Sequence, residues 1–305
     1  MIELLEEHRL ILMEAAIVER LRRTDGVQLH ETLLNAPLIY DELGSTALGT
    51  IYQEYIDIAS QAELPLLLCT PTWRASRSRV HESDRAHFIN IDAARYMRVL
   101  CEPYIERGAR IHIGGMIGCR NDCYKPEEAL TSTEARAFHS WQIDQLVQGG
   151  VDFLIAETLP STDEALGIAM AMEQSQLPYI ISFVIARDGK VLDGTTLETA
   201  IDTIDAGTVR KPLGYMVNCA HPSFLNPDKQ PQRLFSRLIG FQANASALDH
   251  CDLDESCELH ADDLSEWGEL MLELNRSYGV NILGGCCGTG ADHLHYLVDH
   301  FQTHG

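Results

Sequence analysis

The sequence predicts an α/β protein folded as a single (β/α)8 TIM barrel over residues 1–305. Three observations lead to this prediction. Short apolar runs recur along the chain, segments with helical patterning separate them, and the series has the length that such a barrel needs, roughly 250 residues. A doubly wound open sheet is the alternative, but no dinucleotide-binding glycine motif follows the first apolar run.

The apolar runs are the predicted strands. They are apolar almost throughout, without alternation of apolar and polar residues, as in parallel strands that are buried on both faces. In chain order the eight predicted strands lie at residues 10–16, 64–70, 109–117, 152–158, 179–185, 213–219, 237–244 and 280–287.

Helical spacing of apolar residues predicts helices between these strands. Residues 49–62 predict one helix, because their apolar residues recur on one face. Ser161 and Glu164 form a capping-box pattern, which predicts the start of another helix just before an apolar stripe. Thr289 is the predicted cap of the last helix. The apolar residues that this helix is expected to bury are Leu294, Leu297, Val298 and Phe301.

The charge balance excludes some classes of partner. The chain carries 23 Lys and Arg residues against 45 Asp and Glu residues, a formal net charge of −22 at pH 7. We expect no nucleic-acid partner, because phosphate binding needs clustered basic residues. No segment has the roughly 18 consecutive apolar residues of a membrane span, and the start of the chain is acidic where a secretory signal is basic. We therefore expect a cytoplasmic protein without a membrane partner, and the composition leaves a homo-oligomer open.

Polar residues stand at the C-terminal ends of several predicted strands, where the active sites of such barrels lie. Apolar strands do not need these groups for packing. The polar residues at these ends are Glu14, Thr70, Glu157, Thr158, Asn218, Cys219, Asn244, Cys286 and Cys287.

The three cysteines among them, Cys219, Cys286 and Cys287, predict a metal site. In a reducing compartment, clustered cysteines indicate metal binding or catalysis more than a disulfide framework. Three thiolates with one open position suit catalytic Zn2+, because soft sulfur ligands favour zinc or copper(I) over magnesium or calcium. Such a site would activate a substrate thiol for attack on an electrophilic carbon, such as the methyl group of a sulfonium. The alternative is that the three cysteines are small buried core residues.

Four segments carry more specific information: residues 149–165 (GGVDFLIAETLPSTDEA), 192–197 (LDGTTL), 217–222 (VNCAHP) and 284–294 (GGCCGTGADHL). Together they resemble the homocysteine S-methyltransferase family of zinc-dependent barrels, in order and over nearly the whole chain. The resemblance implies an enzyme that transfers a methyl group to the thiol of homocysteine, giving methionine. The implied donor is a small cation such as S-methylmethionine, S-adenosylmethionine or a betaine.

The resemblance also implies roles for single residues. Zinc would be held by Cys219, Cys286 and Cys287, and Glu157 would hold the amino group of homocysteine. The alternative for Glu157 is a salt bridge inside the barrel. The further substrate-binding candidates are Glu14, Thr158, Asn218, Asn244 and Trp73.

Several of these substrate-binding candidates could have purely structural roles. Asn218 and Asn244 could instead satisfy backbone groups at strand ends, and Glu14 could cap its neighbouring loop. Trp73 is proposed to face the methyl cation through cation–π attraction. The arginines of residues 72–85 are candidates to grip a substrate carboxylate, with a solvated loop as the alternative.

The chain departs from the family at three turns. Residues 13–21 read MEAAIVERL and have no glycine, with Glu14 where the family has Asp. Residues 70–73 read TPTW, and residues 118–126 read GCRNDCYKP. All three changes fall where the amino acid or the donor should bind. Two alternatives follow: the same chemistry on another thiol or selenol, or a zinc-binding barrel without transferase activity that acts as a sensor or partner subunit.

The remaining candidate ligands lie outside these motifs. Cys119 and Cys123 form a single pair with no second pair nearby, so we expect no metal-binding role for them. Cys251 and Cys257 fall in an acidic run that reads as a solvated loop. His221 stands just beyond Cys219, before a proline, and is expected at the surface or beside a ligand rather than as a ligand.

Overall fold

The computed structural model describes residues 1–83, 87–248 and 262–302. Its eight strands are parallel and pair in chain order into a closed barrel in which β1 also pairs with β8. The predicted barrel is confirmed, each predicted strand overlaps an observed one, and closure excludes the open sheet. The strands are β1 (Ile11–Met13), β2 (Leu66–Cys69), β3 (Ile111–Gly118), β4 (Phe153–Leu159), β5 (Tyr179–Phe183), β6 (Gly214–Ala220), β7 (Leu238–Ala243) and β8 (Ile282–Gly285).

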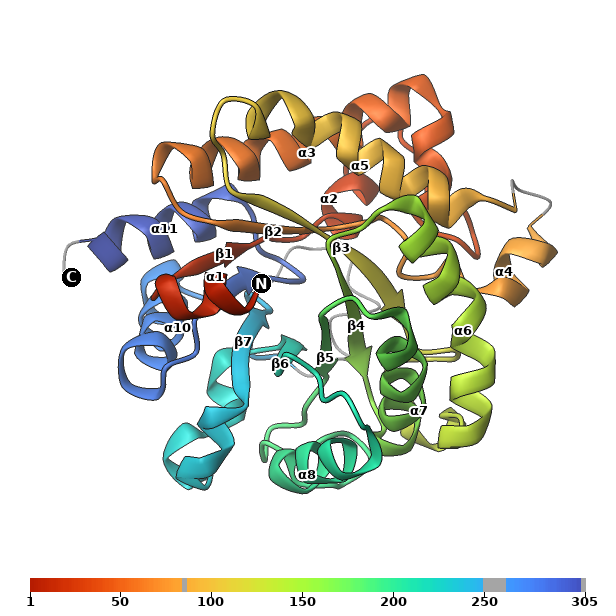
Figure 1. Cartoon of the computed structure of the whole chain (residues 1–305). Helices are drawn as coiled ribbons and strands as arrows, with labels where there is room; N and C mark the ends of the chain where they lie inside the picture. The colour runs from red at the N-terminus through yellow and green to blue at the C-terminus, as the bar shows by residue number, and fades with distance from the viewer. Residues whose placement is uncertain (84–86, 249–261, 303–305) are drawn as a thin grey trace.

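Helices form an outer ring around the strands (Figure 1). The α-helices are α1 (Ile2–Glu7), α2 (Val18–Arg22), α3 (Glu42–Gln61), α4 (Arg77–Glu82), α5 (Ile89–Ile105), α6 (Ser132–Gly149), α7 (Thr162–Met172), α8 (Leu197–Gly207), α10 (Leu264–Tyr278) and α11 (Ala291–Gln302). Short 3-10 helices are η1 (Ala36–Tyr40), η2 (Pro126–Glu128), η3 (Glu173–Ser175), η4 (Pro222–Leu225), η5 (Pro227–Lys229) and η6 (Gln232–Ser236). None of the helices in the described ranges is long and apolar enough to cross a membrane.

The helix predicted at residues 49–62 begins earlier than its apolar pattern indicated. In α3 the side chain of Asp41 accepts a hydrogen bond from the backbone N–H of Gly44 and caps the helix there. The first turn is therefore fixed by capping and not by apolar spacing.

The two other predicted helices begin close to the predicted residues, but the predicted side-chain caps do not form. Ser161 precedes α7 without a side-chain capping bond. Glu164 is fully buried and instead accepts hydrogen bonds from His139 and from the backbone of the segment after β3. Thr289 does not cap α11: its hydroxyl donates to the carbonyl of Cys286 at 2.7 Å. Of the apolar residues expected to be buried in α11, Leu294, Leu297 and Val298 are buried and Phe301 is partly buried.

Alternation of side chains along each strand builds an interior layer and an outer layer. In β4, Phe153 and Ile155 belong to the apolar cluster inside the barrel, whereas Leu154 and Ala156 pack outward against the helices. Glu157 has the same parity as the two inward residues and so points into the barrel. The strand therefore places a carboxylate above the inward apolar residues of β4, toward the C-terminal end of the barrel.

Candidate active site

Residues at the C-terminal ends of β1, β2 and β4 are linked to one another by hydrogen bonds. Glu14 directly follows β1, and its Oε2 accepts a hydrogen bond from the backbone N–H of Cys69 at 2.6 Å. The thiol of Cys69, the last residue of β2, lies 3.9 Å from Oε1 of Glu157. All three residues are buried. Glu14 thus holds the end of β2, while capping of its neighbouring loop and a role in substrate binding both stay predictions.

The two buried carboxyl groups have different acidities. Burial raises the pKa of Glu157 to about 7, although the hydrogen bond from Cys69 lowers it. Burial raises the pKa of Glu14 well above its ordinary value, against the opposing effect of the Cys69 backbone bond, and the charge of Glu157 raises it further. Glu157 is therefore the member of the pair that ionises near neutral pH.

Three cysteines from β6 and the β8 end form a compact sulfur cluster. The Sγ atoms of Cys219, Cys286 and Cys287 all lie within 4.8 Å of one another. Among the described residues they form the one such group of His, Cys, Asp or Glu whose ligand atoms come this close. Hydrogen bonds with Cys219 and Cys287, followed by burial, raise the pKa of the Cys286 thiol well above its usual value. The three predicted ligands are thus brought together, and a bound metal cation would favour their thiolate forms over the neutral thiols.

Two glycines explain how the paired cysteines reach this position. A Cβ atom on Gly284 would lie 2.8 Å from the carbonyl oxygen of Met13, and one on Gly285 would lie 2.1 Å from Oγ1 of Thr289. No side chain fits at either place without a shift of backbone or of Thr289. The absence of side chains lets β8 lie against β1 and lets the next turn fold tightly over the strand.

The backbone bends sharply where β4 and β6 present their polar residues. Thr158 and Cys219 both adopt left-handed conformations, with φ of 58° and 52°, which cost residues other than glycine roughly 1–2 kcal/mol each. The pairing register of both strands shifts around these residues. As a result, Oγ1 of Thr158 lies 3.7 Å from Sγ of Cys219.

Both predicted asparagines brace this arrangement. Asn218 bonds the backbone and side chain of Thr158 and also accepts a hydrogen bond from Oγ of Ser182 at 2.7 Å. Oδ1 of Asn244 accepts from the backbone N–H of Cys287 at 3.2 Å. These contacts match the alternative in which the asparagines satisfy groups at strand ends, and direct contact with substrate stays a prediction.

A family model described as homocysteine S-methyltransferase matches residues 11–301. The chain belongs to the homocysteine S-methyltransferase family. The resemblance carried by the cysteine and β4 motifs is therefore confirmed.

Individual relatives agree with this assignment. The chain is 25% identical to "Homocysteine S-methyltransferase 1" of Arabidopsis thaliana over 175 residues, which cover 53% of this chain and only 50% of the relative. It is similar in fold to the homocysteine methyltransferase MmuM from Escherichia coli. The metallated form aligns with a TM-score of 0.76 at 17% identity over 98% of each chain, and the apo form with a TM-score of 0.68 at 16% identity over 96% of each.

The glycine-free turn after β1 is accommodated without strain in this family member. No residue between Glu14 and Val18 has a positive φ. Ala15 and Ala16 are buried, and the backbone N–H of Ala16 donates to Oγ1 of Thr289 at 3.3 Å. The turn is thus tied to the loop that carries the paired cysteines.

Trp73 lies at the rim of the barrel, next to the residue expected to bind the amino group. Its Nε1 donates to the backbone oxygen of Glu157 at 3.4 Å. The guanidinium carbon of Arg74 lies 4.2 Å from the center of the Trp73 ring. One face of the indole therefore already carries a cation from the protein itself, which leaves less of the ring for a methyl cation.

Two residues that the sequence did not single out also border the site. Cys69 contacts both buried carboxyl groups. Burial, followed by the charges of Cys219 and Cys287, raises the pKa of Tyr124 well above its usual value, so this tyrosine lies beside the cysteine cluster. A signal for Tyr124 was its place next to Cys123 in the segment that departs from the family.

The other candidate ligands are placed as follows. Cys119 and Cys123 are buried in the core and do not join the sulfur cluster. His221 is also outside the cluster but is buried, contrary to a surface position, and its Nδ1 accepts from the backbone N–H of Ser223. Cys251 and Cys257 lie outside the described residues.

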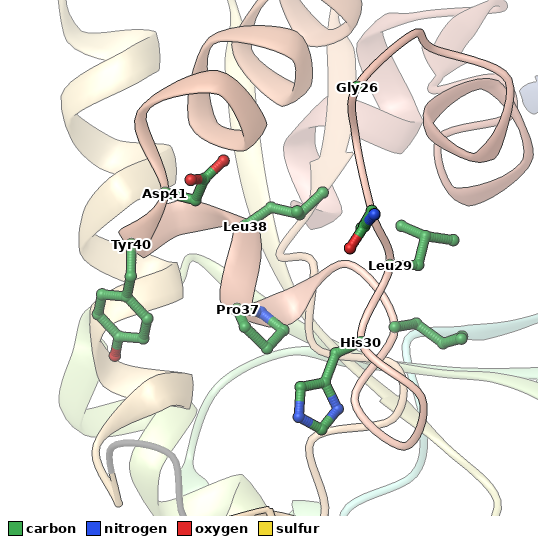
Figure 2. Close-up of a pocket in the computed structure, with 9 residues that line it drawn as sticks. Gly26, Leu29, His30, Pro37, Leu38, Tyr40 and Asp41 are labelled. Atoms are coloured by element: carbon green, nitrogen blue, oxygen red, sulfur yellow. The ribbon is translucent and has the colours of Figure 1, made fainter.

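A separate hollow of about 500 Å³ lies in the segment around η1 (Figure 2). None of the predicted site residues lines it, so it does not belong to the cysteine site. Its lining residues are Gly26, Gln28, Leu29, His30, Leu34, Pro37, Leu38, Tyr40 and Asp41.

Proposed function

We propose that this chain is a zinc-dependent methyltransferase that moves a methyl group from a small cationic donor to the thiol of homocysteine, giving methionine. The observation that carries the proposal is the cluster of Cys219, Cys286 and Cys287 at the C-terminal end of the barrel in a member of this family. Sulfur atoms within 4.8 Å of one another suit a metal with bonds to sulfur of about 2.3 Å. Zinc bound there would supply the charge that lowers the pKa of a substrate thiol.

Glu157 supports the amino-acid part of the proposal. A buried carboxylate is unfavourable without a cationic partner, and among the described residues no Lys, Arg or His forms an ion pair with Glu157. The ammonium group of homocysteine would be that partner. Its binding would favour the ionised form of a carboxyl group whose pKa is about 7.

The remaining residues would hold the reacting groups in position. Asn218, through Thr158, and Asn244 would keep Cys219 and Cys287 in one orientation, so that the donor methyl carbon and the acceptor sulfur meet in line. Such positioning supplies much of the rate in methyl transfer between two bound substrates. A net charge of −22 would favour approach of a cationic donor such as S-methylmethionine, S-adenosylmethionine or a betaine. A cytoplasmic location would keep the three thiols reduced.

The test is detection of methionine by mass spectrometry after incubation of reduced, zinc-loaded protein with L-homocysteine and each donor in turn. We expect methionine with at least one donor and none with Cys219→Ala. Cys101→Ser is the matched control, because Cys101 is buried in α5 and lies outside the sulfur cluster. No methionine from fully loaded wild-type protein would contradict the proposal.

Competition identifies the acceptor. In a mixture of homocysteine with other thiols and a selenol, we expect methionine to be the main methylated product. Preferential methylation of another acceptor would support methyl transfer to a thiol or selenol other than homocysteine. The altered turn after β1 would then be part of the binding site for that acceptor. Methylation of none of them would favour a binding role for the zinc barrel.

A further inference from the structure

Two arginines near the mouth of the barrel, Arg74 and Arg79, form no ion pair with the acidic residues that the structure describes. Nη1 of Arg74 donates to the backbone oxygen of Asn121 at 2.6 Å and to that of Cys119 at 3.5 Å. Arg79 donates to the backbone oxygen of Thr32 at 3.1 Å, and to a second backbone oxygen in the segment after β3. In the described part of the chain, neither arginine forms an ion pair with Asp or Glu.

Acidic residues outnumber basic ones by 45 to 23, and several other partly buried arginines have acidic partners, although Arg210 is likewise held by carbonyl groups without an ion pair in the described part of the chain. Arg20 pairs with Glu54 at 2.7 Å, and Arg237 pairs with Asp205 at 2.9 Å. Arg74 and Arg79 are thus held by neutral carbonyl groups and form no ion pair within the described ranges, although the charge of Glu82, on the same helix as Arg79, acts on Arg79.

The two charges also lie close to each other. Burial, followed by the positive charge of Arg74, lowers the pKa of the Arg79 guanidinium. Both side chains are only partly buried. Nε and Nη2 of Arg74 and Nε of Arg79 have no acceptor among the described residues. Polar hydrogens therefore remain for an anion that would relieve the repulsion.

Their position relates them to the proposed amino-acid site. Arg74 stacks on the ring of Trp73, whose Nε1 in turn donates to the backbone oxygen of Glu157. The residue expected to bind an ammonium and a guanidinium suited to a carboxylate thus contact the same indole ring, Glu157 through its backbone oxygen. An amino acid carries both complementary charges.

We propose that Arg74 and Arg79 form a binding site for the carboxylate of an amino-acid substrate. The proposal rests on the proposed function and extends it, because it requires that at least one substrate carry a free carboxylate. Both homocysteine and an amino-acid donor such as S-methylmethionine do, so the site recognises chemistry that two substrates share. A donor without a carboxylate would lose this contact.

The experiment measures binding by calorimetry to reduced, zinc-loaded full-length protein. L-Homocysteine is compared with its carboxamide, and S-methylmethionine with its carboxamide, so that each pair differs in the carboxylate alone. We expect at least one acid to bind about tenfold or more tightly than its amide, since a charge-assisted hydrogen bond contributes at least that much. The pair that shows the preference identifies which substrate the arginines hold.

Variants assign the preference to the arginines. Arg74→Gln and Arg79→Gln should each reduce the preference for the acid over the amide. Arg74→Lys should retain part of this preference, because lysine keeps the positive charge but lacks the planar guanidinium group. Arg77→Gln is the matched control: Arg77 is exposed on the same segment and makes no hydrogen bond or ion pair with the described residues. Thermal unfolding of each variant shows whether the fold is retained.

The outcomes separate this proposal from the function on which it rests. No carboxylate preference in either pair, or an unchanged preference in folded Arg74→Gln and Arg79→Gln, would overturn the arginine site. Equally efficient methyl transfer with acid and amide substrates, giving methionine from homocysteine and methioninamide from its carboxamide, would support the methyltransferase and contradict the arginine site. If the protein makes no methionine but binds carboxylates in preference to amides through the arginines, the result would support the carboxylate site and contradict the proposed methyl transfer.

Discussion

The side-chain amide of Asn218 holds Thr158 at two points. Oδ1 of Asn218 accepts from the backbone N–H of Thr158 at 2.8 Å, and Nδ2 donates to its Oγ1 at 2.7 Å. Thr158 in turn lies 3.7 Å from Sγ of Cys219, and both Thr158 and Cys219 have positive φ. The asparagine thus joins the strained ends of β4 and β6, one of which carries Glu157 and the other a predicted zinc ligand.

Removal of this link should affect stability and metal binding together. In Asn218→Ala three hydrogen bonds within a buried cluster are lost, and we expect the free energy of unfolding to fall by about 2–4 kcal/mol. Zinc affinity should fall as well, because Cys219 loses its neighbour's support. Urea unfolding and competition with a chelator measure the two effects. A variant with normal stability and normal zinc affinity would contradict the bracing role.

Loss of one cysteine should release the metal without loss of the fold. Cys287 follows β8 and is only partly buried, so Cys287→Ser should keep the barrel but lower the bound zinc from about one ion per chain to well below half. Elemental analysis after dialysis measures this ratio, and circular dichroism follows the fold. Cys101→Ser should retain its zinc. Full zinc retention in Cys287→Ser would remove Cys287 from the ligand set.

The sequence predicted the barrel because the apolar runs are long and the segments between them have helical periodicity. It also placed Glu157 near the C-terminal end of a strand, where the structure has it in β4, because a polar residue there interrupts an otherwise apolar run. The three cysteines could be grouped for a related reason, since the C-terminal ends of neighbouring parallel strands lie at the same end of a barrel.

Contacts between distant segments were not predicted. The pattern of Ser161 and Glu164 matches a capping box, yet Glu164 bonds His139 and two backbone N–H groups from the segment after β3. Local spacing cannot distinguish these alternatives, because a buried carboxylate binds whichever donors the tertiary fold supplies. The positive φ of Thr158 and Cys219 could not be predicted either, because it too depends on contacts between segments that are distant in the sequence.

Glu164 should make the fold sensitive to acid. Burial by itself would raise the pKa of Glu164, but hydrogen bonds from His139 and the backbone of Arg120 hold it below its ordinary value. The group therefore contributes stability above the pKa of the unfolded chain, about 4.5, and that contribution is lost as the pH falls through the lower folded value. Glu164→Gln should be less stable than wild type at pH 7, and the difference should narrow on acidification.

Thermal unfolding between pH 3 and pH 7 measures this dependence. Glu127→Gln is the matched control, because Glu127 is exposed in η2 and should leave the profile unchanged. A constant difference between wild type and Glu164→Gln at every pH would mean that shape and packing, and not ionisation, account for the effect.

Glu157 should show opposite effects on stability and on substrate binding. Its pKa of about 7 in the folded protein exceeds the ordinary value of 4.5, so the folded state binds the proton more tightly. This contribution to stability is present below pH 4.5 and is lost as the pH rises towards 7. Glu157→Gln, which has no ionisable group at this position, should therefore be more stable than wild type at pH 7 and above.

The same carboxyl group should control homocysteine binding. The ammonium group of homocysteine is attracted by the ionised form, so binding to wild-type protein should strengthen as the pH rises through about 7. Glu157→Gln should bind homocysteine at least about tenfold more weakly at pH 8 and should keep only the pH dependence that comes from ionisation of the substrate thiol. Calorimetric titration of zinc-loaded protein at pH 6, 7 and 8 measures both. Equal affinity in the two proteins at pH 8 would show that the amino group binds elsewhere.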